Sequence, residues 1–158
     1  MTQELATTSP GDTEQTSLER TREEVDIAMK MGKWIIESHS VNMKGRIYVM
    51  VTGATALAAG CGYSVREASS ERKLIEGCGW VWESTCEVID RQTGNVIGRG
   101  SGIVADDEAL WKNRPQFARR AMSSTRAAGR ALRLSVGHLF AALGAGVASV
   151  TREEMPDE

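Results

Sequence analysis

The amino-acid sequence predicts an α+β fold, in which a β-hairpin, a short helix, a three-stranded antiparallel meander and a long basic C-terminal helix follow one another. Apolar residues alternate between positions 41 and 51, and Lys44-Gly45 suits the tight turn of a hairpin. Three further segments have the composition of strands, residues 63–69, 79–90 and 96–105. A helix is expected to begin near Pro115, because the first helical turn tolerates proline.

The N-terminal part of the chain divides into two stretches. Residues 1–16 hold Ser, Thr, Gly, Pro and acidic residues with a single large aliphatic side chain, which is the composition of a disordered acidic tail. Residues 17–155 are expected to form one α+β domain. It begins with a helix that frays near Gly32, and a short Ala-rich helix is expected at residues 54–62.

The long basic helix carries the main functional signal. Between positions 109 and 152 there are eight Lys or Arg residues and no Asp or Glu. At about 100° per residue, one stripe of the helix collects the side chains of Arg119, Arg126, Arg130 and Arg133. Phe117, Leu132 and Val136 cluster on the opposite side, which we expect to face the core. A basic stripe without acidic partners on its own helix favours anion binding, with nucleic-acid phosphates as the first candidate.

Two patterns in the predicted sheet have structural interpretations. Gly98, Gly100 and Gly102 alternate along one strand, and their missing side chains would let a helix backbone approach the sheet. Trp80 and Trp82 share a strand face with apolar residues. Tryptophans on a sheet can stack on bases, but the acidic residues on the opposite face favour a core position for both.

The composition restricts the class of protein. The net charge is −2, and outside residues 109–152 the chain has 11 basic residues against 21 acidic ones. The three cysteines show no CxxC spacing, so we expect reduced thiols, no metal site and no cofactor. The first thirty residues are polar and predict no signal peptide, and the apolar run at 139–150 is too short to span a bilayer. We expect an intracellular protein of a prokaryotic cell or a phage-infected host, without a membrane partner.

Three segments together resemble a known family. They are MKGRIYVMVTG (43–53), GWVWESTCEVIDRQTGNVIGRGSG (79–102) and, above all, WKNRPQFARRAMSSTRAAGRALRLSVG (111–137). In these motifs and in the order of its elements, the chain is similar to single-strand annealing proteins of the Rad fifty-two superfamily, particularly the small phage and prokaryotic members. The resemblance covers about residues 33–155.

The resemblance implies a non-catalytic protein that binds single-stranded DNA and anneals strands in homologous recombination and repair. It implies a homo-oligomeric ring or spiral whose subunits each offer a hairpin and a basic helix to one groove. A single-strand-binding protein or a recombinase is a candidate further partner. The DNA-binding residues that it implies, together with the basic residues that extend the same patch, are Lys44, Arg46, Lys112, Arg114, Arg119, Arg126, Arg130 and Arg133.

Two other functions fit the same residues. An order of helix, three antiparallel strands and helix also describes a double-stranded RNA-binding module. Alternatively, in an assembly protein the arginine stripe would bind an acidic protein surface, such as residues 106–108 of a neighbouring subunit or the acidic N-terminal tail. We expect no enzymatic activity, because three adjacent acids in a polar loop usually diverge and no nucleophile and base stand at a suitable spacing.

Overall fold

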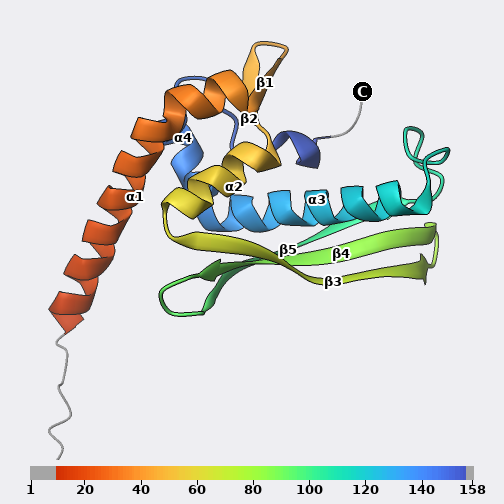
Figure 1. Ribbon diagram of the computed structural model, residues 1–158, viewed down its shortest axis with the longest axis horizontal. Coiled ribbons are helices and arrows are strands. Elements are labelled where there is room, and N and C mark those ends of the chain that lie inside the picture. The colour runs from red at the N-terminus through yellow and green to blue at the C-terminus, as the bar shows by residue number, and fades with distance from the viewer. Residues whose placement is uncertain (1–9, 156–158) are drawn as a thin grey trace, which may run out of the picture.

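The computed structural model describes residues 10–155, and Figure 1 shows their arrangement. Helix α1 (Pro10–Ser38) leads into the hairpin of β1 (Ser40–Met43) and β2 (Arg46–Val49), followed by α2 (Val51–Gly60). Strands β3 (Tyr63–Ile75), β4 (Gly79–Asp90) and β5 (Val96–Ala105) form an antiparallel sheet in that order. Helix α3 (Gln116–Val136), the turn η1 (Gly137–Leu139), α4 (Phe140–Leu143) and the turn η2 (Arg152–Glu154) complete the chain. The predicted α+β fold is confirmed.

The N-terminal helix differs from the prediction at both ends. It begins at Pro10, so the last seven residues of the predicted disordered tail are helical, whereas residues 1–9 lie outside the described residues. Proline in a first turn and acidic residues just after it both favour a helix start. The helix also continues through Gly32, where an added Cβ would lie 2.2 Å from the carbonyl oxygen of Leu143. Gly32 therefore serves the contact with α4 and does not end the helix.

The hairpin turn is confirmed at Lys44-Gly45, where both residues have positive φ angles, 52° and 81°. Such a pair matches the right-handed twist of the two flanking strands. The other edge of β2 is also occupied: Ile47 forms a parallel bridge with Val147, and its carbonyl accepts a hydrogen bond from Ala148 at 2.8 Å. The chain that follows α4 therefore returns to the hairpin.

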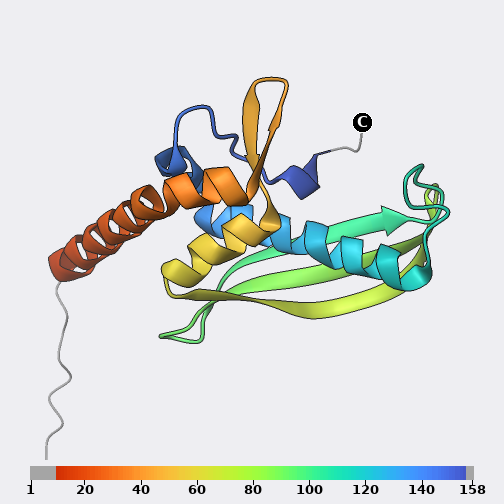
Figure 2. The same cartoon turned by 45° about the horizontal axis from the view of Figure 1, so that its top comes forward.

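Helix α3 lies across one face of the three-stranded sheet, as Figures 1 and 2 show from two directions. The helix approaches closely because β5 presents glycines to it. A Cβ added at Gly100 would lie 2.4 Å from the backbone nitrogen of Ala131. A Cβ added at Gly102 would lie 2.4 Å from the backbone nitrogen of Ala127. The prediction that the alternating glycines admit a helix backbone is confirmed.

The orientation of α3 differs from the helical-wheel prediction. Its sheet-facing row consists of small residues four positions apart, Ser123, Ala127 and Ala131, all fully buried. Phe117, expected in the core, is 76% exposed. Close contact with a glycine path selects small side chains for the interface, and this constraint overrides the apolar pattern in the first turn.

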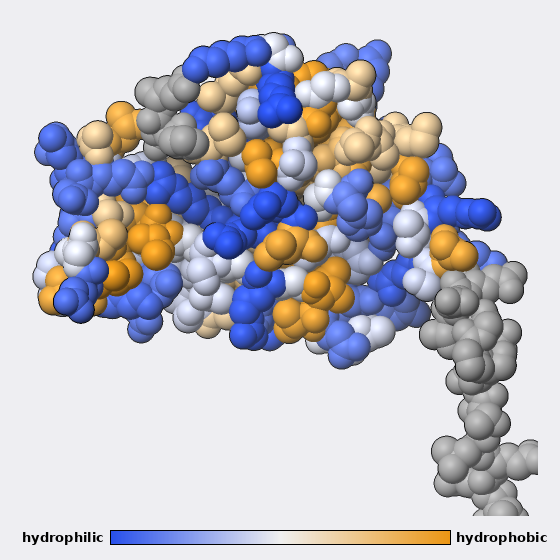
Figure 3. Space-filling model, turned by 180° about the vertical axis from the view of Figure 1, so that it is seen from behind, coloured by the Kyte–Doolittle hydropathy of each residue, from blue (hydrophilic) through white to orange (hydrophobic). Residues whose placement is uncertain are grey.

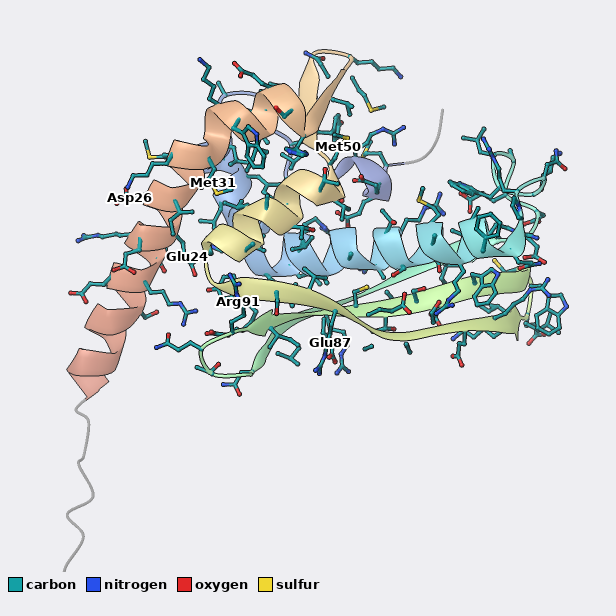
Figure 4. All side chains as sticks on the ribbon, in the orientation of Figure 1. Glu24, Asp26, Met31, Met50, Glu87 and Arg91 are labelled. Carbon is teal, nitrogen blue, oxygen red and sulfur yellow. The ribbon has the colours of Figure 1, made fainter. Side chains whose placement is uncertain are left out.

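The outer face of the sheet is polar, but its acidic residues have basic partners. Glu87 accepts hydrogen bonds from Arg66 at 2.9 Å and from Arg99, and Figure 4 shows it on the side of the sheet away from α3. These bonds, with that from Arg66 first, lower the pKa of Glu87. Glu83 pairs with Lys73 in the same way. The face is therefore closer to neutral than the sequence indicates.

Helix α1 is fastened to the sheet by a polar cluster. Arg20 donates a hydrogen bond to Asp90 at 2.8 Å and lies 5.4 Å from the centre of the Tyr63 ring. The Tyr63 hydroxyl donates to Glu24, which Figure 4 labels on α1. Burial, followed by this bond to Glu24, raises the pKa of Tyr63 to about 12, so its hydroxyl stays protonated.

Replacing Gly100 by alanine is expected to destabilise the protein by about 1–3 kcal/mol, because the added methyl group forces the α3 backbone away from the sheet. Urea unfolding measures this loss. Ser101→Ala, on the exposed face of the same strand, is the control and should change the free energy of unfolding little. Equal free energies of unfolding for the two variants would contradict the close contact between α3 and β5.

The pairing of Asp90 predicts a dependence of stability on pH. The hydrogen bond from Arg20, and next the one from the Gln92 amide, lower the pKa of Asp90. A carboxyl with a lowered pKa stabilises the fold above its unfolded pKa of about 3.9 and loses that contribution as the pH falls through the folded value. Asp90→Asn should therefore lower the melting temperature at neutral pH and have little effect near pH 2. The exposed Asp26→Asn is the control, and a loss for Asp90→Asn that is the same at both pH values would contradict the pairing.

Candidate nucleic-acid interface

Of the four arginines predicted to form a stripe, Arg126, Arg130 and Arg133 lie along the β5 side of α3. Arg126 and Arg133 have carboxylate partners from the same chain. Arg126 donates to the backbone carbonyl of Ile103 on β5 at 2.8 Å and to Glu108 at 3.0 Å. Arg133 donates from Nε to Glu154 at 2.9 Å. Glu108 follows β5 and Glu154 follows α4 in the chain, so these arginines pair with acids of their own chain.

Arg119 has a structural role. It is 9% exposed, and its Nη1 lies 2.9 Å from Oδ1 of Asp106. Asp106 also pairs with Arg72 of β3, whose guanidinium lies 5.0 Å from the centre of the Trp80 ring. Asp106 thus joins the start of α3 to the edge of the sheet. Arg119 therefore has little exposed surface to offer to DNA, and its predicted role in DNA binding stays a prediction.

Arg130 differs from the other arginines of the stripe. Its side chain is exposed, and within residues 10–155 no carboxylate forms an ion pair with it. It lines a pocket of about 420 Å³ between α3, the edge of β5 and residues 153–155. Arg126 and Ile103 also line this pocket, and Glu108, Glu153 and Glu154 contribute its negative charges. We call this the α3 pocket.

The remaining predicted contacts are exposed but spread over two regions. Lys112 and Arg114 lie in the loop before α3, close in sequence to the first turn of the helix. Lys44 and Arg46 flank the hairpin turn. In both ribbon views the tip of the hairpin points away from α3, so the structure does not bring these two residues against the arginines (Figures 1 and 2). The exposed cations therefore form separate sites around one side of the molecule.

The two tryptophans have different environments. Trp82 is half-buried on the α3 side of the sheet and donates from Nε1 to Gln116 at 2.6 Å. Trp80 is 48% exposed, so the predicted core position is wrong for this residue. Its ring is available on one side for contact, while Arg72 lies over the ring.

Sequence reasoning missed the acids that neutralise the stripe. Glu153 and Glu154 immediately follow the acid-free stretch, but their distance from α3 in sequence gives no sign of contact. One interpretation of the sequence makes residues 106–108 the acidic surface of a neighbouring subunit, whereas in the structure Asp106 and Glu108 pair with arginines of their own chain. The excess of arginine on one face of the helix indicates that acidic partners exist, but it does not indicate which residues they are.

Figure 3 shows the molecule from the back of the view in Figure 1. Hydrophilic residues run across the middle of this face, and apolar residues gather above and below them.

The three cysteines are free thiols, and burial raises the pKa of Cys61 to about 11. Among the residues described, no group of three or more His, Cys, Asp or Glu is placed to hold a metal ion. No helix in this part of the chain is both long and apolar enough to cross a membrane.

Removing the Asp106 carboxylate is expected to destabilise the protein. Asp106→Ala leaves the buried Arg119 without its partner, and the loss should be about 2 kcal/mol because Asp106 itself keeps some access to water. The exposed neighbour Asp107→Ala is the matched control and should change the stability little. Thermal and urea unfolding compare the two variants, and similar losses would contradict the role given to Asp106.

Comparison of the chain with protein-family models finds no matching family, and comparison with curated proteins finds no matching sequence.

Proposed function

We propose that this protein binds single-stranded DNA and promotes the annealing of complementary strands as a homo-oligomer, without catalysing a chemical step. The observation that carries the proposal is Arg130, an exposed guanidinium beside Arg126 in the α3 pocket that has no carboxylate partner among the described residues. Such a group costs little to bring against a phosphate, because no ion pair with residues 10–155 has to break.

The surroundings of Arg130 also support a nucleic-acid ligand. Lys112 and Arg114 are exposed near the other end of α3, and Lys44 and Arg46 are exposed on the hairpin. A strand that passes along α3 would meet Arg130 first and the loop cations next. Phosphate contacts of this kind hold a strand by its backbone and leave the bases free to pair.

The order of elements gives a second line of support. A hairpin, a short helix, a three-stranded antiparallel sheet and a long helix are the elements that the resemblance to the Rad fifty-two superfamily implies. The motif TRAAGRALR lies on α3, where Gly129 and the alanines pack closely and the arginines face outward or toward β5. The same motif therefore combines close packing with cation placement.

Arg130→Gln is expected to weaken the binding of a labelled oligothymidine in fluorescence anisotropy. Loss of one phosphate contact should reduce the log–log salt slope by about 0.7 and leave the fold unchanged by circular dichroism. Arg22→Gln, an exposed arginine on α1, is the matched control for net charge.

The same titration separates the competing functions. Duplex DNA and structured RNA are run beside the single strand, and preference for structured RNA would replace the proposal by an RNA-binding function. An annealing assay with two complementary strands then tests the second half of the proposal. The proposal is overturned if no nucleic acid binds at low salt either to the wild type or to a variant in which Glu153 and Glu154, two acids that line the α3 pocket, are replaced by glutamine.

A further inference from the structure

The segment that closes the α3 pocket comes from beyond α4. After the bridge between Val147 and Ile47, the chain reaches Thr151, which is fully buried against α3. It fits there because position 129 is glycine: an added Cβ would lie 2.6 Å from the Thr151 hydroxyl oxygen. Residues 147–151 are thus anchored at two places. Residues 152–155, which we call the cover, extend from this anchor over the arginines.

Each of the two adjacent carboxylates of the cover occupies an anion-binding position. Glu154 accepts a hydrogen bond from Arg133 at 2.9 Å. Glu153 accepts one from the backbone amide of Val51 at 3.0 Å, and Val51 is the first residue of α2. Amides in the first turn of a helix lack intrahelical acceptors and face the positive end of its dipole, so they bind anions.

The same two carboxylates also line the α3 pocket, together with Arg126 and Arg130. Arg133, the Val51 amide and the pocket arginines therefore all lie beside these two carboxylates, which cover part of the surface that the donors form. A phosphate has the same charge sign and the same hydrogen-bond acceptors as a carboxylate. Any polyanion that binds along α3 must share this surface with the cover or displace it.

The internal contacts of the cover suit displacement. Its four residues are all partly exposed, and η2 is a single turn whose ends are capped locally, with Glu154 accepting hydrogen bonds from the amide and hydroxyl of Thr151. In the Arg133–Glu154 ion pair the side chains are 34% and 13% exposed, so water and salt reach the pair mainly from the arginine side and weaken it in part. The anchor at Thr151, by contrast, is buried and stays in place.

We propose that the cover is a displaceable inhibitor of the polyanion site. Glu153 and Glu154 hold the positions that two DNA phosphates take, and the cover lifts away from its Thr151 anchor when a strand binds. The inference rests on the proposed binding of single-stranded DNA along α3. It adds that the free protein holds this site partly closed, so the measured affinity is lower than that of the open site.

The double variant E153Q/E154Q tests the competition. Glutamine at position 154 can still form the capping box with Thr151, so η2 keeps its local structure. We expect oligothymidine to bind about tenfold more tightly at low salt, with a smaller gain at high salt. The control E23Q/D26N removes two exposed acids from α1 and makes the same change in net charge. An equal gain in the control would overturn the inference, because the effect would then come from net charge alone.

Hydrogen exchange on the wild-type protein gives a second measurement. The amide of Met155 donates to the carbonyl of Arg152 at 3.1 Å, so its exchange reports whether the cover is formed. Saturation with oligothymidine should speed its exchange at least about threefold, while the amide of Ala148, which donates to β2, keeps its rate. Slower exchange at Met155 would overturn displacement.

The two proposals fail in different ways. If the wild type binds DNA but E153Q/E154Q gains no more affinity than the control variant, the inhibitory role of the cover is wrong and the proposed DNA-binding function stands. If the wild type does not bind DNA but E153Q/E154Q does, the inhibitory role of the cover is supported, because the cover then closes the site fully in the free protein. If neither protein binds at low salt, both proposals are overturned.

Discussion

The close approach of α3 to the sheet determines most of this structure. Because β5 presents Gly98, Gly100 and Gly102, the helix backbone rests almost on the strand, and the side chains at the interface have to be small. Ser84 and Ser123 form a fully buried hydrogen bond at 2.6 Å within this contact. Because the helix lies so close to the sheet, long side chains do not fit between the two and emerge along the sides of the helix. Arg126 therefore reaches a strand carbonyl at the edge of β5, whereas Arg120 emerges on the other side of the helix and reaches Ser70 and Glu67 of β3.

The charge distribution follows from this geometry. Guanidinium groups gathered along one edge need anions, and among the described residues Asp106, Glu108 and Glu154 pair with them. Two of these acids lie in the loop that enters α3, so they also hold that loop in place. The third belongs to the cover, whose hold on the surface is weaker. Arg119 is thus buried and paired at one end of the helix, whereas Arg130 is exposed beside the pocket, where we propose that the ligand binds.

Local signals in the sequence predicted much of the fold. The Lys44-Gly45 turn, the limits of β4 and β5 and the start of α3 after Pro115 depend on short-range chemistry, and the structure has them where the sequence placed them. The errors concern long-range contacts. Phe117 and Trp80 are exposed because the packing between elements decides their burial, and no periodicity encodes that. The acids that pair with Arg119, Arg126 and Arg133 lie 13 to 21 residues away from them along the chain, where the sequence alone does not identify them.

Helix α1 has a consequence for the behaviour of the molecule in solution. Its 29 residues span about 44 Å, and its N-terminal part extends beyond the body in both ribbon views (Figures 1 and 2). A compact chain of 158 residues has a radius of gyration of about 15 Å, so a helix of this length makes the subunit anisotropic. The isolated subunit will tumble more slowly about its short axes than its mass suggests. In an assembly the same helix can reach a neighbour that the body of the subunit does not touch.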